Sequence, residues 1–239
     1  MQCRVVYLPT SFLYANKCTK PLNDLLTSLR SEIYVEPYSS IDFSKHRTTV
    51  AATDLKKKPS IIATLANAVF STWESYLRPQ WLLERANERV LHLIDREDNN
   101  TDYNCLAPVN KAFHVVAVYW SAGKDSVKLK RHLEKLPTYI WQSGDGMTAG
   151  GTNGVQVWDT AFSVQAAFEA GLTAKPEFRN SLENALQFLD SSQLTEDLDD
   201  PYRQKRKGGW PFSTKDNGYI VSDCSAESLK AVILLQEEW

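Results

Sequence analysis

The sequence lacks several features that mark common functional classes. No hydrophobic run approaches the eighteen or so residues that cross a bilayer as a helix. The four cysteines, Cys3, Cys18, Cys105 and Cys224, include no pair at C-x-x-C spacing. Basic and acidic residues nearly balance, 27 against 29, so no surplus is available for a nucleic-acid surface. We therefore expect no metal site, no nucleic-acid partner and a reducing compartment.

Glycine is absent before Gly123, and five glycines then crowd into residues 144–154. Glycine is costly inside helices and useful where the backbone needs unusual freedom. The first half of the chain is therefore predicted to be regular. Residues 144–154 are predicted to form a loop or a domain crossing, with a domain boundary near residue 140.

Apolar residues recur at the spacing of an amphipathic helix along most of the chain. The pattern predicts consecutive helices with short connections, which is an all-α fold. The predicted helices cover residues 22–33, 60–77, 83–94, 110–121, 126–136, 157–170, 176–190 and 226–235.

Charged and ionisable residues outside the helical stripes are predicted to be structural or solvated. The segment 194–207 carries an acidic run followed by a basic run, which is typical of a solvated loop. The four histidines, His46, His92, His114 and His132, lie in helical or charged surroundings and are predicted to be structural or surface residues.

Asp223 opens the last predicted helix, and local sequence leaves two interpretations open. Its carboxylate can cap the helix by accepting backbone N–H bonds, which would keep its pKa low. Alternatively, an apolar cavity would favour the protonated form and make Asp223 a proton donor. In that case the Cys224 thiol would orient the acid. Glu227, one helical turn later, would relay protons back to it.

The sequence Asp223-Cys224-Ser225-Ala226-Glu227 resembles the Asp-Cys-Thr-Ala-Glu motif of the oxidosqualene cyclases. Ser225 replaces the usual threonine and keeps its hydroxyl group. Further stretches that resemble the family are residues 3–9, 29–34, 145–147, 151–154, 156–162, 202–203, 206–209 and 212–214. A departure is Gln2, because the family usually has a histidine there.

This resemblance implies an enzyme that needs no cofactor. Asp223 would protonate the epoxide of (3S)-2,3-oxidosqualene and start its cyclisation to a lanosterol-like tetracyclic triterpene alcohol. Cys224 and Glu227 would support the acid. Trp158 and Phe212 would stabilise carbocations through their aromatic faces. The product itself is not decided by these residues.

The family's glutamine–tryptophan repeat is also recognisable, split by the charged segment. Its members would be Ala185, Phe188, Leu189, Gln193, Gly208 and Trp210. In this family such repeats tie helices together.

The resemblance further implies an α/α toroid (α/α barrel) architecture. Residues 1–140 would form part of an inserted barrel domain, and residues 141–239 the start of the catalytic barrel domain. The chain would be an internal fragment, inactive alone because half a barrel leaves apolar surface uncovered. The family's site of action implies a peripheral, monotopic position on the endoplasmic reticulum membrane or a lipid droplet. The membrane surface would be contacted by parts mostly absent here.

Two alternatives remain open at the level of sequence. One is a non-catalytic relic of a cyclase or a helical interaction module. The other is an unrelated α/α barrel such as a glycosidase or a prenyltransferase subunit. That alternative requires paired carboxylates or a zinc site, and neither is evident.

Overall fold

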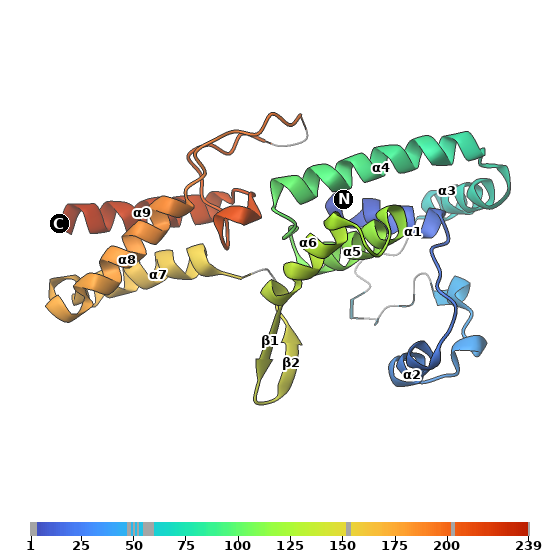
Figure 1. Cartoon of the computed structure of the whole chain (residues 1–239), viewed down its shortest axis with the longest axis horizontal. Helices are drawn as coiled ribbons and strands as arrows, with labels where there is room; N and C mark the ends of the chain where they lie inside the picture. The colour runs from blue at the N-terminus through green and yellow to red at the C-terminus, as the bar shows by residue number, and fades with distance from the viewer. Residues whose placement is uncertain are drawn as a thin grey trace. The chain divides into compact units, whose positions relative to one another are not determined.

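The computed structural model describes residues 4–46, 49, 51, 53–54, 60–151, 154–201 and 204–238. Apart from one two-stranded hairpin and an isolated bridge, the regular structure of these residues is helical, which confirms the predicted all-α class (Figure 1). Some residues of the family-like stretches lie outside the described residues, namely Gln2, Cys3, Thr152, Asn153, Tyr202 and Arg203.

The chain divides into two compact units, and residues 17–86 form the smaller one. It contains α2 (Asp24–Ile33), α3 (Ile61–Thr72), a π-helical turn (Trp73–Leu77) and the first part of α4 (Gln80–Asn100). Side-chain caps explain where two of these helices begin. Asn23 accepts the backbone N–H of Leu26 at 2.9 Å, and Ser60 accepts that of Ala63 at 3.1 Å.

The larger unit comprises residues 1–16 and 87–239. Its elements are the rest of α4, α1 (Arg4–Ala15), α5 (Pro108–Ala122), α6 (Val127–Glu134), β1 (Ile140–Ser143), β2 (Gly146–Ala149), α7 (Gln156–Glu169), α8 (Pro176–Ser192) and α9 (Ser222–Glu238). Helix α1 packs against α5, and α5 packs against α6. Helix α1 was not predicted from the sequence, because Pro9 lies inside it and proline normally breaks a helix.

Part of the glycine-rich stretch is a strand, so the prediction of a loop was wrong for residues 146–149. Strands β1 and β2 pair in antiparallel register, with Ser143 opposite Gly146. Gly146 has a φ angle of 120°, which a residue with a side chain adopts only with strain. The glycines here permit a tight hairpin turn, and irregular backbone follows β2 up to α7.

Helices α7, α8 and α9 pack together around a shared apolar core (Figure 1). Its fully or almost fully buried members are Val157, Ala161, Val164, Leu182, Leu189, Trp210, Ala231 and Leu235. This core holds α7 and α9 against each other, so Trp158 and Asp223, which lie in their first turns, belong to the same packed group of helices.

The side chains of Trp210 and Gln193 form hydrogen bonds at the two ends of the charged segment 194–207, in agreement with the predicted repeat. The indole Nε1 of Trp210 donates to the Leu189 carbonyl at 2.7 Å, and Gln193 Nε2 donates to the Gly208 carbonyl at 2.9 Å. The Leu189 carbonyl lies in the last turn of α8, where helical partners run out, so the indole replaces one. Two backbone bonds between Leu194 and residues 208–209 complete the base.

The charged segment 194–207 is only partly solvated, so its prediction as a solvated loop needs correction. Asp200 is buried, and its Oδ2 accepts from Asn100 Nδ2 at 3.0 Å and lies 3.5 Å from Arg96 Nε. A charge run in the sequence cannot reveal that one of its carboxylates meets partners about one hundred residues away.

We expect Trp210→Phe to lower the free energy of unfolding by about 1–3 kcal/mol, since the buried Leu189 carbonyl loses its donor. Urea unfolding followed by circular dichroism measures the change. Trp141→Phe is the matched control, because Trp141 is 64% exposed on β1. Equal stability of the two variants would contradict the capping role of the indole.

Among the described residues, no helix is long and apolar enough to cross a membrane.

Candidate functional site

Asp223 lies in the first turn of α9, and its side chain is exposed in the described chain. Its Oδ1 accepts the backbone N–H of Cys224 at 2.8 Å. The carboxylate therefore sits at the positive end of a helix, where backbone N–H groups point outward. An apolar enclosure around Asp223, which the proton-donor interpretation requires, is not provided by the residues the structure describes.

Cys224, next to the acid, is completely buried. Burial raises the pKa of its thiol to about 11, and the negative charge of Asp223 and a hydrogen bond to it act in the same direction. The thiol is therefore protonated at neutral pH. A protonated thiol can donate to the Asp223 carboxylate, and it is a poor nucleophile.

Glu227 lies one turn after Asp223 and is half-buried. Its Oε2 accepts a hydrogen bond from Nε2 of Gln165, a buried residue of α7, at 2.9 Å. Gln165 was not predicted as a site residue. A signal was present, because Gln165 follows Trp158 by seven residues, which places both on one face of α7.

Trp158 and Phe212 lie in ring contact although 54 residues separate them in the sequence. Their ring centroids are 5.7 Å apart, and Phe162 approaches Trp158 at 4.7 Å. The backbone N–H of Trp158 donates to the Phe212 carbonyl at 3.2 Å, and that of Val157 donates to the Ser213 carbonyl at 3.0 Å. Residues 212–213 thus satisfy N–H groups in the first turn of α7.

Residues 209–213, here called the strap, also bind the beginning of α9. Pro211 forms a bridge with Ile220, and the backbone N–H of Val221 donates to the Trp210 carbonyl at 3.2 Å. The strap therefore lies between the first turn of α7, which carries Trp158, and the segment that leads into Asp223. All five predicted site residues belong to these three neighbouring elements.

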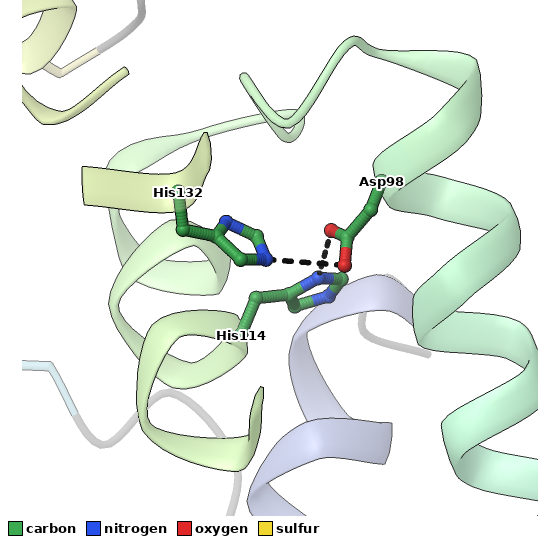
Figure 2. Close-up of side chains that lie close together, drawn as sticks. All are labelled: Asp98, His114 and His132. Carbon is green, nitrogen blue, oxygen red and sulfur yellow. Dashed lines mark hydrogen bonds and ion pairs between the residues drawn. The ribbon is translucent and has the colours of Figure 1, made fainter. Parts of the chain in front are cut away.

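A second polar cluster lies elsewhere in the same unit, formed by Asp98, His114 and His132 (Figure 2). The three side chains come from α4, α5 and α6, and each is at most 1% exposed. Asp98 Oδ1 lies 2.8 Å from His114 Nδ1, and Asp98 Oδ2 lies 3.1 Å from His132 Nε2. The prediction of structural histidines fits His114 and His132, but sequence analysis did not single out Asp98.

The ligand atoms of this cluster all lie within 4.8 Å of one another, a spacing that a metal ion could use. Lys111 argues for a hydrogen-bonded arrangement instead. Its Nζ lies 3.1 Å from His132 Nδ1 and donates to the Tyr103 carbonyl at 2.6 Å. An ammonium group only donates, so Nδ1 of His132 accepts and Nε2 carries the proton toward Asp98. A metal ion could bind Nε2 only in the other tautomer, in which Nδ1 carries the proton and a neutral Lys111 accepts it. Burial lowers the pKa of Lys111 to about 8, so at pH 7 the side chain still carries its proton.

The same cluster predicts acid sensitivity. Burial lowers the pKa of His132 below its ordinary 6.5, assisted by the charges of Lys111 and His114 and opposed by Asp98. Burial alone would raise the pKa of Asp98, but hydrogen bonds from His114 and His132 hold it at about 2, below its ordinary 3.8. Both groups therefore have a lower pKa in the folded chain than in the unfolded chain. Where each one titrates, the unfolded chain binds more protons, so the free energy of unfolding falls as the pH falls.

We expect the free energy of unfolding to decrease below pH 6.5, by up to about 1.4 kcal/mol per pH unit for His132. A second decrease should begin below about pH 4, as Asp98 contributes. Urea unfolding at a series of pH values measures both. His92→Asn is the control for the loss of one imidazole, because the His92 side chain is exposed. A flat profile between pH 7 and pH 5 would contradict a buried, neutral His132.

The motif around Asp223 resembles that of the oxidosqualene cyclases, and the described fold is all-α, as this resemblance implies. No family model matches the chain. Known proteins do match it along 98% of its length: the lanosterol synthases of Pneumocystis carinii, at 46% identity, and of Saccharomyces cerevisiae, at 42%, and protostadienol synthase A of Neosartorya fischeri, at 40%.

The chain is homologous to lanosterol synthases, and the resemblance to oxidosqualene cyclases seen in its motifs is thereby confirmed. It spans about a third of the length of the curated relatives it matches, 33% for the Pneumocystis carinii protein and 32% for the Saccharomyces cerevisiae protein.

Proposed function

We propose that this chain supplies the acid-bearing segment of an oxidosqualene cyclase, an intramolecular transferase of sterol and triterpenoid biosynthesis. Its substrate would be (3S)-2,3-oxidosqualene and its product a lanosterol-like tetracyclic triterpene alcohol. The observation that carries the proposal is the strap, because it links the Trp158–Phe212 ring pair to the start of the helix that bears Asp223. Identity of 40–46% to lanosterol and protostadienol synthases supports the same reaction class.

In the proposed mechanism Asp223 gives its proton to the epoxide oxygen. The carbon–oxygen bond then breaks as the electrons of a neighbouring double bond attack the carbon. The protonated Cys224 thiol stabilises the Asp223 carboxylate that remains, by donating a hydrogen bond to it. Glu227, held by Gln165, returns a proton to Asp223 after turnover.

Trp158 and Phe212 would face the positive charge that moves along the substrate. Each aromatic face stabilises a nearby cation by about 0.5–2 kcal/mol at a desolvated contact. The cyclisation also requires a cavity that excludes water, because water would quench the cation early. Asp223 is exposed in the described chain, so we propose that the remaining cavity wall comes from other polypeptide and that the chain alone is inactive.

The proposal includes the architecture and location that the family resemblance implies. Residues 1–140 would belong to the inserted α/α barrel domain and residues 141–239 to the catalytic one. The assembled enzyme would be peripheral and monotopic on the endoplasmic reticulum membrane or a lipid droplet. No cofactor takes part in this mechanism.

A chimaera tests the proposal. Residues 1–239 replace the homologous 32% of the Saccharomyces cerevisiae lanosterol synthase, and the chimaera is expressed in yeast that lacks its own enzyme. We expect growth without added sterol and a cyclised triterpene alcohol by mass spectrometry, whereas the chain alone gives no product. A folded chimaera that fails to consume oxidosqualene would favour the alternative, a non-catalytic relic or helical interaction module.

A further inference from the structure

Ser225 is the point at which the strap and the acid-bearing helix meet. Its Oγ accepts the backbone N–H of Trp210 at 2.9 Å and lies 3.4 Å from the Trp210 carbonyl oxygen, to which it can donate. One hydroxyl group therefore engages both backbone polar groups of the same strap residue. Ser225 itself stands two residues after Asp223, within the first turns of α9.

The contact between strap and helix is close enough to exclude a side chain at Gly209. A Cβ atom there would come within 2.7 Å of Ile220 Cγ2 and 3.2 Å of Ser225 Oγ. Such close approach of backbone to a helix is a position where glycine is needed. The hydroxyl bond of Ser225 is thus part of a tightly fitted junction.

A serine in a helix commonly bonds the carbonyl four residues earlier, and that role would be purely local. Ser225 differs, because its hydroxyl bonds to the backbone of a residue fifteen positions away, on the strap. Ser228, on the same helix and also buried, provides the contrast. Its hydroxyl has no hydrogen-bond partner among the described residues.

The strap continues from this junction to the aromatic pair. Two residues after Trp210, Phe212 contacts the Trp158 ring and its carbonyl accepts the Trp158 N–H. A shift of the strap at Trp210 would therefore move Phe212 relative to both Asp223 and Trp158. The Ser225 hydroxyl is thus connected to the ring pair by its hydrogen bonds to Trp210, by the two peptide bonds from Trp210 to Phe212, and by the ring contact of Phe212 with Trp158.

We propose that Ser225 is a positioning residue, whose hydroxyl sets the place of Phe212 and Trp158 relative to the acid Asp223. This inference rests on the proposed function for its catalytic consequence, but its structural part stands on the chain alone. Threonine at this position keeps the hydroxyl, whereas valine has the shape of threonine without it. The pair Ser225→Thr and Ser225→Val therefore separates the hydrogen bond from side-chain volume.

The first measurement is hydrogen–deuterium exchange on the 239-residue chain. We expect Ser225→Val to speed exchange of the Val157 and Trp158 amides about tenfold, because their acceptors on the strap become less ordered. Ser225→Thr should exchange like the parent chain, and so should the control Ser228→Ala. If Val and Thr variants exchange alike at these amides, the proposal is overturned.

The second measurement is turnover by the chimaera. Ser225→Val should lower kcat about tenfold and raise the share of incompletely cyclised products, with KM for oxidosqualene little changed. Ser225→Thr should keep kcat and the product distribution of the parent chimaera. Altered exchange with unaltered kcat and products in Ser225→Val would overturn the positioning role. An inactive parent chimaera would count against the proposed function instead, and the exchange result would still decide whether Ser225 holds the strap.

Discussion

Replacing Asp223 with asparagine should lower the turnover of oxidosqualene by the chimaera about 10²–10⁴-fold, the usual contribution of a positioned general acid. Asparagine keeps the size of the side chain and can still accept the Cys224 N–H, so the first turn of α9 should persist. It cannot release a proton to an epoxide oxygen. The change is therefore expected in kcat, with little change in KM.

The measurement is the rate of oxidosqualene conversion over a range of substrate concentrations, which gives kcat and KM, with the triterpene alcohol quantified by mass spectrometry. Asp190→Asn is the control, because Asp190 is also exposed but lies on α8 in no predicted site. Circular dichroism and urea unfolding establish that both variants fold. Retention of more than about a tenth of the parent turnover by Asp223→Asn would assign the proton to another residue.

Replacing Asp98 with alanine should lower the free energy of unfolding by about 3–5 kcal/mol, the cost of removing one partner from a buried ionic network. The carboxylate accepts from both His114 and His132, and Cys105 Sγ lies 3.8 Å from its Oδ1. Without the carboxylate, two buried imidazole N–H groups lose their acceptor. The positive charge of Lys111 also loses the negative charge that offsets it.

Asp95→Ala is the matched control, one turn earlier on the same helix. Asp95 pairs with Lys128 at 2.6 Å, but both side chains are more than 40% exposed. Such an exposed pair contributes about 0–1 kcal/mol. Urea unfolding of the two variants at pH 7 therefore should differ by several kcal/mol. Similar losses in both would show that the Asp98 network does not support the fold.

The helices were predictable because their signals are local. Apolar spacing located helices α2 to α9, and the Gln193–Trp210 repeat was recognisable across the charged segment because its residue types are distinctive. The site residues were predicted from motifs that resemble those of the oxidosqualene cyclases. The contact of Trp158 with Phe212 could not be predicted from the sequence. It depends on the strap, whose backbone bonds carry no residue signature.

The missed features depend on partners far along the chain. Asp98 stands among charged residues near the end of α4 and looks like part of a solvated face. Its burial follows from the histidines of α5 and α6, which only the fold brings close. Asp200 was misjudged for the same reason. Local patterns report which residues favour a helix, but they do not report which polar groups will be enclosed.

The paired backbone bonds of Leu194 with residues 208–209 have a consequence for how sequences of this type can diverge. These bonds join the two ends of the charged segment 194–207, so a change in the length of the segment need not displace Phe212. Doubling the length of a flexible loop costs only about 0.6 kcal/mol in closure entropy. Insertions should therefore accumulate beyond the buried Asp200, between residues 201 and 205, and an epitope tag or fluorophore placed there should leave the contact of Phe212 with Trp158 undisturbed.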